Sequence, residues 1–87
     1  MANYKIRVKR SAQKELEAIG TKKERRRIVS AIAALAADPR PVGCKKLSAS
    51  EYYRIRIGDY RVVYEIADSV LTILVIKVAH RRDSYRQ

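Results

Sequence analysis

Cysteine and histidine are scarce in this 87-residue sequence, which contains one of each, Cys44 and His80. A single cysteine cannot form an internal disulfide bond, and these two residues with scattered acidic side chains do not make a metal-ligand set. A nucleophilic role for Cys44 is not favoured, because His80 is the only possible base for its thiol. We therefore expect a functional site without a metal or another cofactor.

Long hydrophobic runs are also absent. The longest apolar stretch, residues 70–76, has the length of a strand and is much shorter than the ~18 residues of a membrane-spanning helix. The first residues, Met-Ala-Asn-Tyr-Lys-Ile, lack the apolar stretch of a signal peptide. A chain of this length can form one domain, residues 1–87, with one modest core. We expect a cytoplasmic protein that does not bind a membrane.

Negative charge is in short supply. Nine Asp and Glu residues oppose twenty Lys and Arg residues, which leaves a formal net charge of +11 and an isoelectric point near 10.2. So small a body with this charge carries a strong positive field over most of its surface. The composition favours a nucleic acid, a ribosome or an acidic protein as the partner.

Two helices are predicted in the first half of the chain. Ser11 is the expected N-cap of the first helix, and Gly20 is expected to end it. Thr21 and Glu24 have the spacing of a capping box at the start of a second, longer helix. The apolar residues of this helix keep a period of 3.6 until an Asp-Pro pair at residues 38–39, which predicts one face against the core.

A β-hairpin is predicted over residues 52–66. Two runs with period-two alternation flank a Gly-Asp pair at residues 58–59, which supplies a two-residue loop. This loop places Arg56 opposite Arg61, with Arg54 on the same face, while apolar and tyrosine side chains take the other face. Like charges opposite one another destabilise a strand pair by up to about 1 kcal/mol, so their retention indicates that an anion binds there.

A first strand over residues 4–8 and a last strand over residues 70–78 complete the prediction. The last strand is apolar on both faces, which indicates a central position in the sheet and leaves the face of Lys77 undecided. The order strand, helix, helix and three strands favours an α+β fold. In this fold, two N-terminal helices pack on one face of a small antiparallel sheet.

A series of short motifs follows in a fixed order along the chain: Lys46-Leu47, residues 53–57, residues 60–64, His80-Arg81-Arg82-Asp83 and Tyr85-Arg86. With these motifs the chain resembles the RelE branch of the RelE/ParE toxin superfamily over almost its whole length. The resemblance implies the same compact fold. It also implies a toxin that enters the A site of the 70S ribosome, cuts the messenger RNA there, and is silenced by a cognate RelB-like antitoxin.

The resemblance further implies roles for individual residues. The paired basic positions of the family's hairpin, usually lysines, correspond to Arg54 and Arg56, and the arginine of the second hairpin strand corresponds to Arg61. The arginine after the last strand corresponds to Arg81, and the C-terminal tyrosine corresponds to Tyr85. Arginine cannot act as a general acid or base near pH 7, so acid–base chemistry in this chain falls to other residues.

RNA cleavage by the ribose 2'-hydroxyl needs a base, an acid and groups that stabilise charge on the phosphoryl oxygens. Arginine donates two charge-assisted hydrogen bonds to phosphate, so Arg61, and after it Arg81, are candidates for this stabilisation. Tyr85 is a candidate base if flanking arginines lower the pKa of its phenol. His80 is the candidate acid, because histidine titrates near neutral pH without perturbation; its alternative is a strand-end residue that faces solvent.

Other side chains are candidates for contacts with RNA through positive charge or, for the one tyrosine, through stacking on a base: Lys22, Lys23, Arg26, Lys45, Lys46, Tyr52, Arg82 and Arg86. Tyr52 shares a face with the hairpin arginines, whereas the other hairpin tyrosines have the parity of core residues. The basic cluster at the start of the second helix is equally compatible with a solvated helix face and with contact to ribosomal RNA.

The favoured function is the toxin of a type II toxin–antitoxin system, acting as a metal-independent, ribosome-dependent endoribonuclease that inhibits translation. Two alternatives stay open. One is a ParE-like toxin, which shares the fold and inhibits DNA gyrase by protein contact; Arg61, His80, Arg81 and Tyr85 argue against it. The other is a basic RNA-binding protein without catalysis. This alternative stays open because Arg54 and Arg56 stand where the family usually has lysines.

Overall fold

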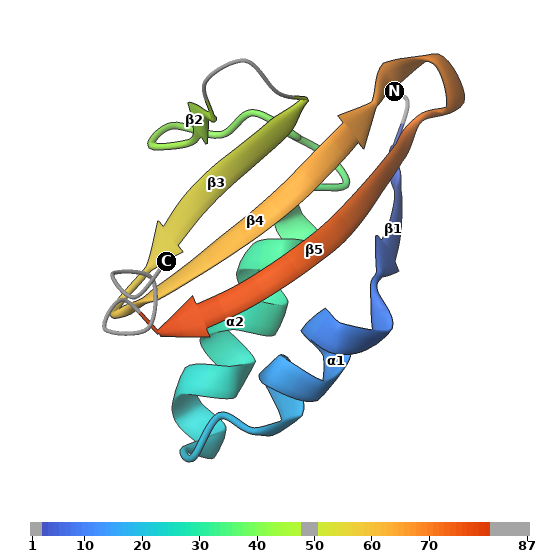
Figure 1. Ribbon diagram of the computed structural model, residues 1–87. Helices are drawn as coiled ribbons and strands as arrows, with labels where there is room; N and C mark the ends of the chain where they lie inside the picture. Colours follow the sequence, from blue (N-terminus) through green and yellow to red (C-terminus); the bar gives the residue numbers. More distant parts are fainter. Residues whose placement is uncertain (1–2, 48–50, 81–87) are drawn as a thin grey trace.

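The computed structural model describes residues 3–47 and 51–80 of the chain (Figure 1). The candidate residues Arg81, Arg82, Tyr85 and Arg86 lie outside the described residues. The elements follow in the order β1 (Lys5–Val8), α1 (Arg10–Glu17), α2 (Lys22–Ala34), β2 (Lys45–Lys46), β3 (Tyr52–Ile57), β4 (Tyr60–Ala67), a short 3-10 turn (Asp68–Val70) and β5 (Thr72–His80).

The strands form one five-stranded sheet in the order β1-β5-β4-β3-β2, and both helices cover the same face of it (Figure 1). The predicted α+β architecture is confirmed, and β5 lies in the interior of the sheet as expected. The sheet is mixed rather than antiparallel throughout, because β1 pairs with β5 in parallel. This pairing sets Ile6 beside Ile73 and Val8 beside Val75, so that the apolar side chains of β1 extend the core face.

The core lies between the two helices and the sheet. Each helix turns a short apolar stripe inward, which is the expected result of the 3.6-residue period. The buried residues of the helical layer are Ala12, Leu16, Ile19, Ile28, Ile32 and Leu35. Those of the sheet include Ile55, Val62, Tyr64, Ile66, Ile73, Val75 and Val78. Among the described residues, no helix is long and apolar enough to cross a membrane.

The start of α2 follows the prediction. Thr21 is the N-cap, its side-chain oxygen accepts a hydrogen bond from the Glu24 N–H at 3.3 Å, and its hydroxyl donates to Glu24 Oε1 at 2.9 Å. The predicted end of α2 is also close, since the helix ends at Ala34 and one further turn leads to residues 38–39. The hydrogen bonds between Thr21 and Glu24 are enough to set the start of α2.

The boundaries of α1 differ from the prediction. Ser11 is not the N-cap: the helix begins at Arg10, and Lys9 takes the capping position without a side-chain hydrogen bond. The reason is tertiary, because the Lys9 N–H donates to the Val75 carbonyl at 2.9 Å and keeps the chain bound to β5 until the helix begins. The helix ends at Glu17, before Gly20, which lies in the connection to α2.

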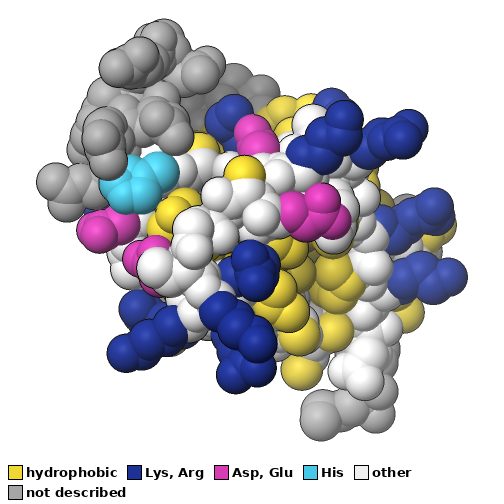
Figure 2. Space-filling model, turned by 90° about the horizontal axis from the view of Figure 1, so that it is seen from below, with side chains coloured by type: hydrophobic (Ala, Val, Ile, Leu, Met, Phe, Trp, Pro, Cys, Tyr) yellow, Lys and Arg dark blue, Asp and Glu magenta, His cyan; other side chains and the backbone are white. Residues whose placement is uncertain are grey.

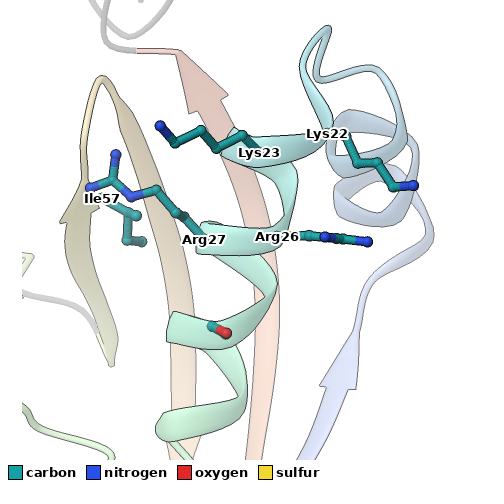
Figure 3. A pocket seen from close by; sticks show the side chains of 6 residues that line it. Lys22, Lys23, Arg26, Arg27 and Ile57 are labelled. Atoms are coloured by element: carbon teal, nitrogen blue, oxygen red, sulfur yellow. The ribbon is translucent and has the colours of Figure 1, made fainter.

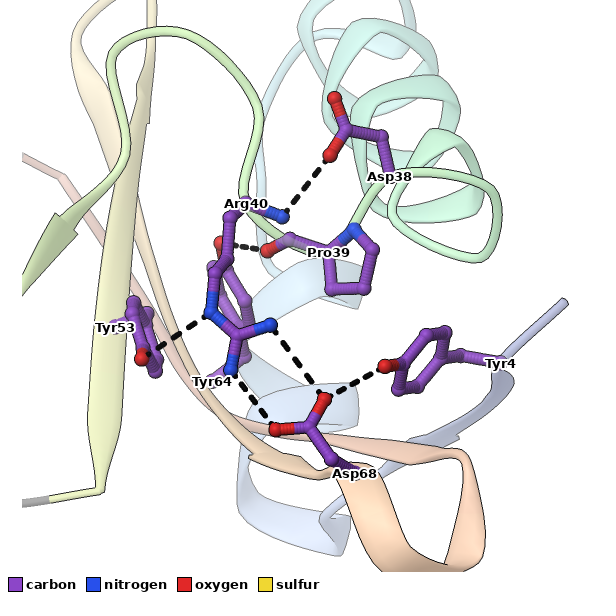
Figure 4. Close-up of polar contacts among 7 residues, drawn as sticks. All are labelled: Tyr4, Asp38, Pro39, Arg40, Tyr53, Tyr64 and Asp68. Atoms are coloured by element: carbon purple, nitrogen blue, oxygen red, sulfur yellow. Dashed lines mark hydrogen bonds and ion pairs between the residues drawn. The ribbon is translucent and has the colours of Figure 1, made fainter. Parts of the chain in front are cut away.

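A polar network ties together four segments that are distant in sequence (Figure 4). Arg40, after α2, forms an ion pair with Asp68 at 2.9 Å and donates to the Tyr53 hydroxyl at 3.3 Å. Tyr4 donates to Asp68 at 2.6 Å, and hydrogen bonds from Arg40 and Tyr4 lower the pKa of the Asp68 carboxyl. The fully buried Tyr64 donates to the Pro39 carbonyl at 2.8 Å. This network fixes the end of the sheet remote from the β3–β4 turn.

Candidate functional site

The β3–β4 hairpin has the predicted register, with Ile57 opposite Tyr60 and Arg56 opposite Arg61. The loop between the strands consists of residues 58–59, and Gly58 has a φ of 60°, which a residue without a side chain adopts at little cost. Directly opposite residues share a face of an antiparallel pair. The register therefore decides which side chains meet across the hairpin.

Three arginines, Arg54, Arg56 and Arg61, lie together on the face of the sheet opposite the helices; they are termed the arginine face. Arg56 and Arg61 form a cross-strand pair, and Arg54 lies two residues from Arg56 on the same strand. Lys45 of β2 pairs with Arg54 and adds a fourth positive charge to this side. Lys46 pairs with a core-face residue and points to the other side.

The positive charges of the arginine face lack counter-charges in the described part of the chain. No carboxylate there forms an ion pair with Arg54, Arg56 or Arg61. Burial lowers the pKa of Arg54, and the charges of Arg56 and Arg61 lower it further. Arg61 is half-buried, and its Nε is inaccessible to solvent and has no hydrogen-bond partner among the residues that the structure describes. A buried donor and three adjacent cations make this surface suited to an anion such as phosphate.

One carboxylate on this side of the sheet is absent from the sequence-based candidates. Glu65 follows Arg61 and Val63 at the same parity along β4 and lies opposite Tyr52. The period-two pattern of β4 was sufficient to find it. Four residues of strand separate it from Arg61 by about 13 Å, which is more than the reach of one phosphate group. Glu65 therefore limits the anion-binding surface at this end.

The tyrosines divide as predicted between the two faces. Tyr52, which is 39% exposed, shares the side of Arg54 and presents a ring that a base can stack on. Tyr53 and Tyr64 stack on one another on the core face with ring centroids 6.0 Å apart, and burial raises the pKa of Tyr64. Only Tyr52 among these three is available to a ligand on the arginine face.

The register between β4 and β5 shifts by one residue between Val63 and Tyr64. The partners of these two residues are Lys77 and Val75, so Ile76 is the extra residue of a β-bulge. A bulge moves all later side chains of its strand to the opposite parity. The bulge thus decides the face of every residue at the end of β5.

His80 lies on the helix-covered face as a result of this bulge. It pairs with Tyr60, and the two rings meet edge to face with centroids 5.1 Å apart. Ala79 is the β5 neighbour of Arg61. His80 and Tyr60 line a cavity of about 230 Å³ together with Glu15 of α1. The structure does not bring His80 to the arginine face.

Lys77, whose face the sequence leaves open, reaches around the edge of β5. Its Nζ lies 3.4 Å from Glu15 Oε2, and Glu15 Oε1 accepts a hydrogen bond from the Val78 N–H at 2.8 Å. β1 ends at Val8, so no described strand pairs with this part of the β5 edge. The Glu15 carboxylate takes the place of a strand carbonyl there.

Four basic residues of α2 line a cavity of about 550 Å³ beside the hairpin, together with Ser30 of α2 and Ile57 of β3 (Figure 3). This cavity is termed the basic groove, and its basic residues are Lys22, Lys23, Arg26 and Arg27. The predicted candidates Lys22, Lys23 and Arg26 are therefore close to one another but lie on the helix side of the sheet. Seen from below, lysine and arginine side chains project around this end of the molecule, with fewer acidic side chains between them (Figure 2). In the described segments, no group of His, Cys, Asp and Glu could hold a metal ion.

Comparisons with known proteins agree with this architecture. A family model described as "ParE toxin of type II toxin-antitoxin system, parDE" matches residues 6–85. A search of curated proteins found no matching sequence.

Solved structures of RelE toxins have the same fold. The RelE of the archaeal RelE-RelB complex from Pyrococcus horikoshii OT3 is 27% identical, with a TM-score of 0.81 over 91% of this chain and 96% of that one. The RelB-RelE antitoxin-toxin complex from Methanococcus jannaschii is 26% identical, with a TM-score of 0.74 over 91% of this chain and 94% of that chain. An arginine-to-alanine variant of E. coli toxin RelE in the free state is 24% identical, with a TM-score of 0.79 over 98% of this chain and 90% of that chain.

Proposed function

We propose that this chain, which belongs to the ParE toxin family and is therefore the toxin of a type II toxin–antitoxin system, is an endoribonuclease that cuts messenger RNA in the ribosomal A site. An antitoxin is its partner, as in the similar RelE complexes. The observation that carries the proposal is the arginine face, on which Arg54, Arg56 and Arg61 lie together without a carboxylate partner in the described chain.

The proposed reaction is attack of a ribose 2'-hydroxyl on the adjacent phosphorus. The P–O bond to the 2'-oxygen forms, the P–O bond to the 5'-oxygen of the next nucleotide breaks, and negative charge rises on the phosphoryl oxygens. Arg56 and Arg61 form a cross-strand pair with Cα atoms about 4.5 Å apart, so that their guanidinium groups can reach one phosphate. Each guanidinium donates two parallel hydrogen bonds to phosphate oxygens.

Arg61 is the residue proposed to stabilise the transition state. Its side chain is half-buried, and no described residue accepts a hydrogen bond from its buried Nε. Donors that are fixed in advance at the position of developing charge contribute strongly, since the loss of one such donor costs on the order of a hundred- to a thousandfold in rate. Arg54 and Lys45 are proposed to bind a neighbouring phosphate, and Tyr52 is proposed to stack on a base.

The proton transfers need other groups, because arginine keeps its proton at neutral pH. Tyr85, outside the described residues, is proposed as the base that accepts the 2'-hydroxyl proton, and water is proposed to give the leaving 5'-oxygen its proton. The position of His80 against Tyr60 on the helix-covered face supports a packing role for this residue more than the predicted role as the acid.

Dependence on the ribosome is part of this proposal. In the described chain the arginine face is a sheet surface with cations that can bind phosphate, and none of its described residues is a group that would orient the 2'-oxygen in line with the leaving 5'-oxygen. Alignment of the reacting atoms lowers the activation free energy by several kcal/mol. The ribosome is proposed to supply this alignment by bending the messenger RNA in the A site.

Gyrase inhibition is the second candidate function, and the match to a family model named for ParE favours it. A gyrase inhibitor would use the arginine face for contact with protein. Its activity would not depend on phosphate binding by the Arg61 guanidinium group, and messenger RNA would stay intact.

The test combines two assays on the purified protein. Ribosomes stalled with a chosen codon in an empty A site are incubated with the protein, and new RNA 5' ends are mapped; DNA supercoiling by gyrase is measured in parallel. We expect cuts confined to the A-site codon, lost in Arg61→Ala and kept in Arg7→Ala, a matched change at a β1 residue opposite Leu74. An intact message with inhibited supercoiling would assign the chain to gyrase inhibition, and no effect in either assay would leave a binding protein without catalysis.

A further inference from the structure

Glu65 is the one acidic residue in the described strands. It shares the parity of Arg61 along β4, so it lies on the same side of the sheet as the arginine face. Its side chain is half-buried, and no described residue forms an ion pair or a hydrogen bond with its carboxylate. A carboxylate accepts hydrogen bonds and cannot donate them, so a ligand of Glu65 must bring a donor.

Tyr52 lies directly across from Glu65 on β3. The Tyr52 carbonyl accepts a hydrogen bond from the Leu47 N–H on the β2 side, at 2.8 Å, so its backbone groups point away from β4. The two residues therefore form a pair of the non-hydrogen-bonded kind, with Cα atoms about 4.5 Å apart and side chains close together. The phenol ring and the carboxylate are neighbours on one face of the sheet.

Leu74 of β5 lies on the other side of Glu65 and is half-buried. Both helices cover the opposite face of the sheet (Figure 1). The row Tyr52, Glu65 and Leu74, termed the base subsite, thus offers an aromatic ring, a hydrogen-bond acceptor and an apolar side chain. Proteins recognise single-stranded RNA with this combination, by stacking a base on a ring and bonding to the edge of the base.

The base subsite lies at a defined distance from the phosphate-binding residues. Alternate residues of a strand are about 6.6 Å apart, so Arg54 is one such step from Tyr52 and Arg56 is two steps away. Arg61 is likewise two steps from Glu65 along β4. If the arginine face holds the phosphates of an RNA strand, the carboxylate repels a further phosphate and leaves this row for a base.

We propose that the base subsite selects bases with an exocyclic amino group and rejects uracil. The base stacks on Tyr52, and its amino group donates to the Glu65 carboxylate. Adenine, cytosine and guanine each carry such a group. Uracil carries carbonyl oxygens in its place, and a carbonyl facing a carboxylate leaves two acceptors without a donor between them. The inference rests on the proposed ribonuclease function, because it concerns which messages are cut.

The test uses stalled ribosomes whose A-site codons differ in a single base, with A, C, G or U at each of the three codon positions in turn. Single-turnover cleavage rates are measured for the natural chain. We expect the uracil codon to be cut about tenfold more slowly than the other three at one position, which is the size of one good base contact.

Glu65→Gln tests the role of the carboxylate. An amide donates as well as accepts hydrogen bonds, so it can pair with a uracil carbonyl. We expect this variant to cut the uracil codon several-fold faster than the natural chain does, with about twofold or less between the four bases. A damaged fold cannot produce such a gain. The matched variant Glu17→Gln removes the same charge from an exposed residue of α1 and should keep the tenfold difference.

The outcomes separate this inference from the function on which it rests. Equal cleavage of all codons by the natural chain would overturn the base subsite and leave the ribonuclease in place. A uniform change of all four rates in Glu65→Gln would show that the carboxylate only repels phosphate, and it would also overturn the base subsite. No cleavage of any codon would refute the ribonuclease itself, and the base subsite with it.

Discussion

Replacement of Arg56 by glutamine is expected to make the fold more stable and the toxin less active. Arg56 lies directly opposite Arg61 and two residues from Arg54, and no described carboxylate balances these charges. Like charges in such a pair cost roughly 0.2 to 1 kcal/mol, less when solvent screens them. We expect a gain of about 0.5 kcal/mol at low salt, which corresponds to about 2 to 4 °C in Tm for a domain of this size.

Salt separates charge relief from other causes of this gain. The Debye length falls to about 3 Å in 1 M salt, so the difference between Arg56→Gln and the natural chain should disappear there. Arg7→Gln is the control, because Arg7 lies on the same side of the sheet but opposite Leu74, and it should leave Tm unchanged. Chemical and thermal unfolding at both salt concentrations provide the measurement. A loss of stability, or a gain that persists in 1 M salt, would refute the reasoning.

Three further changes test the packing of the fold. Tyr64→Phe leaves the Pro39 carbonyl without its 2.8 Å hydrogen bond and should cost about 1 to 2 kcal/mol in urea unfolding; no loss would contradict the burial of this bond. Leu71 has a left-handed φ of 47° and is 41% exposed, so Leu71→Gly should raise the unfolding free energy by about 0.5 kcal/mol, and a lower value would argue against strain there. Glu15→Ala removes the acceptor of the Val78 N–H and should destabilise by about 1 kcal/mol or more, whereas Glu15→Gln should cost less; equal losses would show that only the charge matters.

The hairpin and the start of α2 were predictable because short-range chemistry determines them. A two-residue loop with Gly58 leaves one register for the strands, and that register places Arg56 opposite Arg61. The capping box of Thr21 depends on a residue only three positions away. The arginine face, which contributes most to the proposed function, followed from these local rules.

Long-range contacts decided the features that the sequence did not reveal. The parallel pairing of β1 with β5 joins residues that are more than sixty positions apart, and it also moved the start of α1 from the expected Ser11 cap to Arg10. No local pattern carries this information, since β1 has the same alternation in either direction.

The β-bulge had a larger effect on the predicted site. β5 is apolar on both faces, so alternation cannot reveal the extra residue at Ile76 that turns His80 toward the helices. Glu65 is a different case, because its parity with Arg61 was visible in the sequence of β4. A strand that is polar on one side shows its faces, whereas a strand that is buried on both sides does not.

The proposed role of Arg61 is tested by the single-turnover rate of A-site cleavage on stalled ribosomes, measured for the natural chain and for Arg61→Ala, together with the affinity of each for the ribosome. If the Arg61 guanidinium group stabilises charge on the phosphate, the cleavage rate of Arg61→Ala should fall on the order of a hundred- to a thousandfold, while its affinity for the ribosome changes only a few-fold. An unchanged rate at saturating ribosome, or a loss that lies entirely in binding, would contradict a catalytic arginine face.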